Sequence, residues 1–404
     1  MFENQVKYWL EQRISALNLP LSVCLPDRQL ITPAGSPKVT LMLRTPLAWR
    51  ALVKPSLGKL AKAYVEQELD VRGNRRDIME IGVKLCGAGA EMGRKKINHA
   101  WKWWRHTLSA DRKAIARHYD VSNDFYALWL DRWRVYSCAY FKTPGDSLDL
   151  AQEQKLDLIC RKLDLREGER FLDIGCGWGG LILWAAQRYR AKATGITLSR
   201  NQYEYVGQKI KELGLQDCCQ VMLCDYRELD ECAPFDKIAS VGMFEHVGRR
   251  NLPLYFGKIY RLLKPGGLVM NHGITLSSPD RVELGSDVGK FIEDYVFPGG
   301  ELVHVSEVME TMARQKLECR DAENLRAHYA KTLWHWVERL DAEQDQVRKI
   351  AGEKIFRTWQ VYMAGSADAF ERGWLSVYQL LAGKPLADGT LAYPLAREFI
   401  YRTN

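Results

Sequence analysis

Apolar positions recur at helical spacing near the start of the chain and at strand-like spacing soon after it. The helical spacing, which predicts an amphipathic helix, is that of Val6, Trp9, Leu10, Ile14 and Leu17. A short apolar run at 39–43 predicts a strand, and residues 78–83 again favour a helix. We therefore expect residues 1–93 to form a small α/β domain.

Further along, apolar runs typical of buried strands alternate with longer segments of helical period. These runs lie within residues 171–174, 194–199, 221–227, 235–248 and 262–270. The alternation predicts an α/β fold with a doubly wound, Rossmann-like parallel sheet, in which ligands bind at the carboxyl ends of the strands. Polar side chains expected at that rim are Asp173, Thr197, Asp225, Glu245 and His272. Beyond Ile274 the pattern is helical and aromatic, which predicts a helical insertion or cap over the rim.

A glycine-rich turn at 171–180 separates the first of these strands from a helix. Asp173 stands at its head, and Gly175, Gly177 and Gly179 follow at alternate positions. Glycine is needed where the backbone bends sharply or where a ligand comes too close for a Cβ. The spacing differs from the G-x-G-x-x-G of dinucleotide sites, and no lysine follows, which excludes a phosphate-binding P-loop. A purely structural turn is the alternative interpretation.

Composition limits the classes to which the chain can belong. With 404 residues, 47% hydrophobic and 27% charged, it is globular and long enough for two domains. The polar start and the absence of a long apolar run predict no secretory signal and no membrane span. Ten cysteines without paired metal-ligand spacing indicate a reducing cytoplasm and no metal site. The net charge of +8 favours an acidic partner.

Residues 94–117 combine basic side chains with tryptophans. The residues concerned are Arg94, Lys95, Lys96, Trp101, Lys102, Trp103, Trp104, Arg105, Arg112, Lys113 and Arg117. Such a segment is typical of an anionic membrane surface, where the rings sit at headgroup depth. The same residues could stack on nucleic acid, or form a solvated linker between domains. No recognised nucleic-acid module accompanies them, so nucleic acid is not the expected partner.

Six motifs occur in order from residue 119 onward. They are Tyr-Asp-x-Ser-Asn-x-Phe-Tyr (119–126), Tyr-Ser-Cys-Ala-Tyr-Phe (136–141), Leu-Asp-Ile-Gly-Cys-Gly-Trp-Gly (172–179), Gly-Ile-Thr-Leu-Ser-x-x-Gln (195–202), Glu-His-Val-Gly (245–248) and Phe-Pro-Gly-Gly (297–300). Together they resemble the cyclopropane-fatty-acyl-phospholipid synthase family. The resemblance implies a catalytic domain at 118–404, a basic tryptophan-rich linker at 94–117 and an N-terminal lipid-recognition domain at 1–93.

The resemblance also implies an activity: transfer of a methylene from S-adenosylmethionine (SAM) to the cis double bond of unsaturated acyl chains in membrane phospholipids. By motif, the residues that would contact SAM are Tyr136, Ser137, Asp173, Gly175, Gly177, Gly179, Thr197, Leu198, Ser199, Gln202, Tyr226 and Arg227. Family members hold a bicarbonate ion as general base, and the matching residues here are Cys138, Glu245, His272, Ile274 and Tyr329. A cysteine in the family's C-terminal helix corresponds to Ser366, so a covalent cysteine mechanism there is excluded.

Other functions stay open at this point. A related methyltransferase could make branched-methyl fatty acids or methylate a small amine with the same SAM site. A basic nucleic-acid-binding protein with a vestigial SAM fold is a third possibility. The resemblance favours a cytoplasmic homodimer that is peripheral to the inner face of the membrane, with a phospholipid substrate at the anionic surface.

Overall fold

The computed structural model describes residues 2–32, 35–45, 47–87, 122–279, 285–296 and 301–401, which form two compact units. Unit 1 holds Met1–His99, Asp280–Pro298 and Leu340–Asp368, and unit 2 holds Ala100–Pro279, Gly299–Arg339 and Ala369–Asn404. Helices α13 (Arg326–Ala342) and α15 (Glu353–Glu371) contribute residues to both units. The expected linker at 94–117 and the Phe-Pro-Gly-Gly motif lie outside the described residues. In the described part of the chain, no helix has the length and apolar character needed to cross a membrane.

Unit 1 contains a small mixed sheet of strand order β2-β1-β3-β4, in which β1 runs parallel to β3 and the other pairs are antiparallel. Its elements are α1 (Phe2–Ala16), β1 (Leu21–Cys24), β2 (Leu30–Ile31), β3 (Val39–Leu43), α2 (Ala48–Val53), α3 (Leu57–Val65), β4 (Leu69–Gly73), α4 (Arg75–Leu85), α11 (Gly285–Tyr295) and α14 (Gln344–Ala351). Val6, Leu10 and Ile14 of α1 pack in its core. The expected first helix, the strand at 39–43 and the helix around 78–83 are therefore confirmed.

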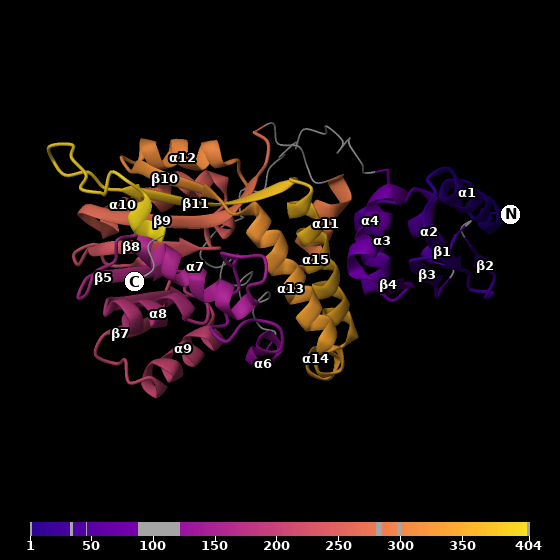
Figure 1. Ribbon diagram of the computed structural model, residues 1–404, viewed down its shortest axis with the longest axis horizontal. Coiled ribbons are helices and arrows are strands. Elements are labelled where there is room, and N and C mark those ends of the chain that lie inside the picture. Colours follow the sequence, from indigo (N-terminus) through magenta and orange to yellow (C-terminus); the bar gives the residue numbers. More distant parts are fainter. Residues whose placement is uncertain are drawn as a thin grey trace. The chain divides into compact units, whose positions relative to one another are not determined.

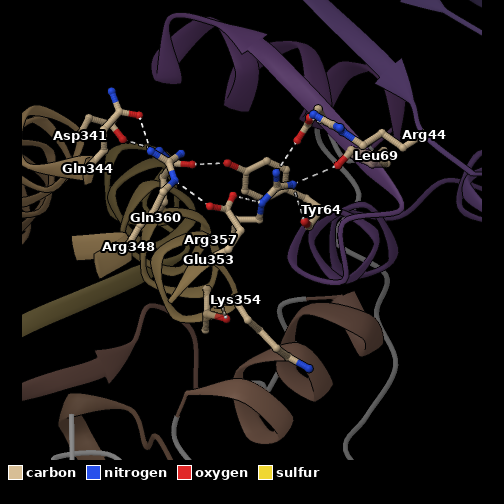
Figure 2. Close-up of polar contacts among 12 residues, drawn as sticks. Arg44, Tyr64, Leu69, Asp341, Gln344, Arg348, Glu353, Lys354, Arg357 and Gln360 are labelled. Atoms are coloured by element: carbon tan, nitrogen blue, oxygen red, sulfur yellow. Dashed lines mark hydrogen bonds and ion pairs between the residues drawn. The ribbon is translucent and has the colours of Figure 1, made fainter. Parts of the chain in front are cut away.

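A buried arginine joins separate segments of unit 1. Arg357 of α15 forms ion pairs with Asp70 at 2.7 Å and with Glu353 at 2.5 Å. It also donates to the backbone oxygens of Tyr64 and Leu69, at 3.0 and 3.3 Å. Figure 2 shows its guanidinium between helix α15 and the N-terminal segment. Because the five donors of one arginine are shared among these partners, the late helix is fastened to the N-terminal sheet.

Unit 2 is built around a seven-stranded sheet of order β10-β11-β9-β8-β5-β6-β7. Its strands are β5 (Arg170–Ile174), β6 (Lys192–Thr197), β7 (Cys219–Leu223), β8 (Phe235–Val241), β9 (Leu263–Leu276), β10 (Glu318–Asn324) and β11 (Leu375–Gly383). The five strands from β5 to β9 pair in parallel, as the sequence predicts. Helices cover both faces of this sheet (Figure 1): α7 (Leu148–Lys162), α8 (Gly180–Tyr189) and α9 (Arg200–Glu212) on one, α10 (Leu252–Leu262) and α12 (Val305–Arg314) on the other.

The chain beyond Ile274 contains the expected helices, among them α12, α13 and α15, but it also contains two strands that the sequence pattern did not predict. Strand β11 runs antiparallel to β9, and β10 runs antiparallel to β11, so two strands extend the parallel sheet at one edge. Almost every residue of β11 is buried, so its sequence shows no two-residue alternation that would separate a strand from a buried helix. Strand β10 is a polar edge strand, which gives an equally weak signal.

Candidate active site

The glycine-rich turn joins the end of β5 to the start of α8. Gly175, Gly177 and Gly179 have φ angles of 83°, 54° and 81°, a region that L side chains rarely adopt. A Cβ on Gly175 would lie 2.9 Å from the Met243 side chain, and one on Gly179 would lie 2.9 Å from Val206. Conformation therefore requires glycine at all three positions, and packing requires it at two. The tight turn expected at the carboxyl end of this strand is confirmed.

The loop after β6 is held by its own side chains. Thr197 Oγ1 donates to Gln202 Oε1 at 2.7 Å and accepts from the N–H of Ser199 at 3.1 Å. Ser199 then caps helix α9 by accepting from the N–H of Gln202. Leu198 lies half-buried between them. Because β6 neighbours β5, this fixed loop lies beside the glycine turn.

At the carboxyl end of β7, Asp225 fixes the next candidate residue. Its buried carboxylate accepts from the backbone N–H of Arg227 and pairs with the Arg227 guanidinium at 2.7 Å. Tyr226 is buried and packs edge-on against the Tyr255 ring. The expected SAM contacts Tyr226 and Arg227 thus lie on the same rim as the glycine turn, with Arg227 held by a charge-assisted bond.

The loop that carries Tyr136, Ser137 and Cys138 is held from helix α7. Gln152 Nε2 donates to the carbonyl oxygen of Ser137 at 2.9 Å, and Lys155 Nζ donates to Ser137 Oγ at 2.8 Å. Both α7 side chains are almost fully buried. Residues three apart lie on one face of a helix, so Gln152 and Lys155 together bind both the backbone and the side chain of Ser137.

Asp173, at the head of the glycine turn, is a buried acid close to this lysine. Burial raises the pKa of Asp173 to about 7, although the charge of Lys155 lowers it. Burial in turn lowers the pKa of Lys155 to about 8. Among the described residues, no donor bonds Asp173 Oδ1. A buried carboxylate oxygen without a donor is costly, and a ligand with a cationic group would relieve that cost.

Glu245 follows strand β8 in a short 3-10 turn, Phe244–His246. Its Oε1 accepts from the backbone N–H of Ile274, in β9, at 2.7 Å. Its Oε2 is buried and has no hydrogen-bond partner among the described residues. Burial raises the pKa of Glu245 to about 7, against the lowering effect of the Ile274 N–H. Glu245 and Ile274 are therefore brought together, with one carboxylate oxygen left over.

His272 lies in β9, level with the end of β8, where it pairs with Val241. It is 2% exposed, and its Nδ1 lies 3.2 Å from Gln379 Nε2. Its other ring nitrogen, Nε2, is buried without a partner in the described part of the chain. Burial, together with the charges of Lys155 and Lys162, holds the pKa of His272 well below its ordinary value. The imidazole is therefore neutral near pH 7.

Cys138 and Tyr329 both contact the carbonyl oxygen of Leu325, the residue before helix α13. Cys138 Sγ lies 3.7 Å from the carbonyl oxygen of Leu325, which also accepts from the backbone N–H of Tyr329 at 3.0 Å. The Tyr329 ring packs against Phe370, with centroids 4.8 Å apart. Burial raises the pKa of the Cys138 thiol far above its ordinary value. Cys138 is therefore a neutral thiol, not a nucleophile.

Two of the expected anion donors have partners within the protein. The N–H of Ile274 donates to Glu245, and the Cys138 thiol lies 3.2 Å from the carbonyl oxygen of Ala139 and close to that of Leu325. Buried donors take the nearest protein acceptor, which explains both contacts. Of the five expected residues, Glu245 and His272 each keep a buried atom, Oε2 and Nε2, that has no hydrogen-bond partner in the described part of the chain.

A chain of aromatic rings lies beside these groups in unit 2. Trp178 of the glycine turn packs on Tyr126, with centroids 4.6 Å apart, and Tyr126 contacts Tyr136. Tyr136 packs on Trp336 at 5.2 Å, and Trp336 contacts Tyr329 edge-on. The rings thus connect the glycine turn to Tyr329. Aromatic faces of this kind favour a positively charged ligand or intermediate.

Sequence reasoning missed Gln152, Lys155 and Gln379. The signal available was polar residues on faces that are otherwise apolar: Gln152 and Lys155 beside Ala151, and Gln379 within the apolar run of β11. A polar residue in such a position needs a partner, but the sequence does not show which one.

This fold and rim define a SAM-dependent methyltransferase. A structure of the mycolic acid cyclopropane synthase CmaA1 complexed with SAH and CTAB superposes with a TM-score of 0.64 at 33% identity, covering 68% of this chain and 98% of that one. The family model for mycolic acid cyclopropane synthetase matches residues 106–380. The chain belongs to this family.

Two curated relatives extend the comparison. A probable fatty acid methyltransferase of Pseudomonas putida is 44% identical over 394 residues, which is 97% of this chain and 99% of the relative. The cyclopropane-fatty-acyl-phospholipid synthase of Escherichia coli K12 is 36% identical over 272 residues, covering 67% of this chain and 68% of that enzyme. The similarity to the Pseudomonas protein therefore includes most of unit 1.

Proposed function

We propose that this protein transfers a methylene from SAM to the cis double bond of unsaturated acyl chains in membrane phospholipids. The observation that carries the proposal is a pair of buried polar atoms, Glu245 Oε2 and His272 Nε2, without partners among the described residues. Met243, which precedes this turn, packs against Gly175 of the glycine loop. This neighbourhood supports the proposal that the pair and the methyl donor share one site.

The site's first task is to align reactants and exclude water. When bound, SAM supplies an electrophilic methyl group on a sulfonium. An alkene is a weak nucleophile, so the chain must hold the double bond in line and keep the site dry. The Tyr136, Trp336 and Tyr329 rings supply apolar faces that stabilise positive charge developing on the acyl chain.

The second task is to remove a proton from the new methyl carbon, so that the ring closes. Bicarbonate would supply the base, and the donor and acceptor set fits it: the neutral imidazole of His272 donates while Glu245 accepts. Glu245 keeps its place because Ile274 holds its other oxygen. With a proton and the demethylated donor as the other products, the reaction balances.

One observation favours a second function. The Pseudomonas relative, which matches nearly the whole chain, is named a probable fatty acid methyltransferase and not a cyclopropane synthase. Transfer without ring closure, to give a branched or methylene-bearing chain, would use the same SAM site. The partnerless Glu245 Oε2 and His272 Nε2 atoms favour loss of a proton from the new carbon, as ring closure requires, over methyl transfer followed by reduction, which needs no base. A methylene-bearing chain also requires that proton loss, so proton NMR of the product decides between it and the cyclopropane.

The test is an incubation of the full chain with SAM and vesicles of unsaturated phosphatidylglycerol. We expect acyl chains that gain one methylene and lose the olefin, detected by mass spectrometry and proton NMR. His272→Asn should abolish ring formation, whereas His304→Asn, at the N-cap of α12, should leave it unchanged because asparagine also caps a helix. No product from any vesicle composition would refute the proposal.

Membrane attachment and assembly belong to the same proposal. We propose that the enzyme acts on anionic phospholipid, because the chain carries a net charge of +8. The family resemblance adds the proposal that it is a homodimer. Sedimentation should give the dimer mass, and vesicle binding should weaken with added salt. Equal binding to neutral and anionic vesicles would contradict the electrostatic part.

A further inference from the structure

Gln379 is a fully buried amide directly opposite His272. The two residues are cross-strand partners in the antiparallel pair of β11 and β9, flanked by the pairs Tyr378–Gly273 and Leu380–Asn271. Gln379 is 0% exposed, and its Nε2 lies 3.2 Å from His272 Nδ1. Burying an amide in this largely apolar strand is unfavourable unless its polar atoms find partners. A leucine would fill the same strand position without that cost, which indicates that the amide at this position has a function.

We propose that Gln379 is a positioning residue that fixes His272 as the Nε2–H tautomer, so that Nε2 donates a hydrogen bond to a bicarbonate-sized anion beside Glu245. This inference rests on the proposed function, which supplies the anion. The strand pairing places the Gln379 amide beside His272 Nδ1, and the anion selects between the two possible tautomers.

The tautomer of His272 depends on which ring nitrogen carries the proton. A neutral imidazole has one N–H and one lone pair. If the Gln379 amide nitrogen donates to Nδ1, the ring proton must sit on Nε2. With the amide reversed, Nδ1 would donate to the amide oxygen, and Nε2 would present a lone pair. A lone pair repels an anion, so only the first arrangement leaves a useful group at the buried Nε2.

The surroundings keep His272 in the neutral form on which this argument depends. Its burial and the positive charges of Lys155 and Lys162 all oppose protonation. Lys162 is engaged with Glu323, and Lys155 with Ser137. Glu245 is the acid on the neighbouring turn, and burial raises its pKa as well. A neutral His272 that donates a hydrogen bond is therefore consistent with the charges of Lys155, Lys162 and Glu245.

The chain contains its own reference for the experiment. The backbone N–H of Phe141 donates to His328 Nδ1 at 3.0 Å. A backbone N–H cannot accept, so His328 must carry its proton on Nε2 when it is neutral. Its tautomer does not depend on Gln379, which makes it an internal standard.

The test is nitrogen-15 NMR of histidine-labelled full-length protein, without SAM or lipid. The His272 signals, assigned with His272→Asn, should show the same Nε2–H pattern as His328. In Gln379→Glu the new carboxylate accepts from Nδ1–H, so we expect the His272 pattern to reverse while that of His328 stays. Gln379→Met, which is similar in size and lacks the donor, should give a mixture and controls for packing.

A second readout is binding of carbon-13 bicarbonate, followed by NMR titration. We expect Gln379→Glu to lose at least about tenfold in affinity, because a charge-assisted bond is removed. An Nδ1–H pattern in the wild-type protein overturns the inference, as does unchanged bicarbonate affinity in Gln379→Glu with a reversed tautomer. A correct tautomer with no cyclopropane product would instead refute the proposed function, so the two failures are distinguishable.

Discussion

Gly273 lies between His272 and Ile274, and a single added methyl group there should disable the site. A Cβ at this position would lie 2.0 Å from Phe244 Cε1 and 2.3 Å from Cδ1, and 3.1 Å from Glu245 Oε1. An ordinary contact needs about 3.4 Å, so the Phe244 ring must retreat by roughly 1.4 Å. Because Phe244 precedes Glu245 in the same turn, the carboxylate moves with it.

The magnitude of the Gly273→Ala effect follows from these distances. Overpacking of a core costs about 1–3 kcal/mol, and weakening the bond from Ile274 to Glu245 adds up to about 3 kcal/mol. A misplacement near 1 Å at a catalytic group typically lowers turnover about 100-fold. We therefore expect turnover to fall by about two orders of magnitude, with a measurable loss of unfolding free energy.

The assay compares turnover, SAH binding by calorimetry and urea unfolding in the Gly273→Ala variant. The matched control is Gly207→Ala in helix α9, where a Cβ meets nothing within 4 Å. That change should stabilise the protein by up to about 1 kcal/mol and leave turnover unchanged. Wild-type turnover in a folded, SAH-binding Gly273→Ala variant would refute the reasoning.

Three further predictions concern charges. Glu245→Gln should abolish ring closure yet raise the free energy of unfolding at pH 8 by up to about 3 kcal/mol. The Glu245 carboxyl has a pKa of about 7 in the folded protein and 4.5 in the unfolded chain, so its ionisation destabilises the fold as the pH rises through that window. A difference in urea unfolding that does not change with pH would contradict this. Lys155→Met should weaken SAH binding, measured by calorimetry, about tenfold, because Ser137 and Asp173 lose a neighbouring cation. Lys162 is equally buried but pairs with Glu323, so Lys162→Met should lower the free energy of unfolding and leave SAH affinity unchanged. Arg357→Met should lower the free energy of unfolding in urea by about 3–5 kcal/mol, because it breaks a buried ion pair. Arg44 contacts the same aspartate but is more exposed, so Arg44→Met should lower that free energy by less than about 1 kcal/mol. Equal losses in the two variants would argue against the buried network.

The sequence predicts the parallel part of the sheet well, because its signals are local. A strand, a glycine turn and a helix follow one another at 171–180, and each is recognisable from neighbouring residues alone. Strands β10 and β11 could not be predicted in this way. Strand β11 pairs with β9 across about 100 positions of the chain, and β10 pairs in turn with β11. Only the folded sheet shows that Gln379 faces His272.

The candidate site was predicted as a set of residue types, but not as a set of contacts. Asp173, Glu245 and His272 could be placed at the rim from strand ends. That Ile274 donates to Glu245, and that Lys155 holds Ser137, depends on side-chain directions that no spacing in the sequence encodes. The division into two units also draws on late segments, such as Leu340–Asp368, that carry no local signal of belonging with the N-terminal sheet.

The most direct test of ring closure uses SAM whose methyl group carries three deuterium atoms. The full chain is incubated with this donor and unsaturated phospholipid vesicles, and the deuterium content of the acyl product is measured by mass spectrometry. Ring closure removes one hydrogen from the transferred carbon, so the account predicts a cyclopropane that retains two deuterium atoms. A saturated branched product that retains all three would contradict it, as would a product with two deuterium atoms whose carbon-13 NMR spectrum shows an exocyclic methylene and no cyclopropane carbons.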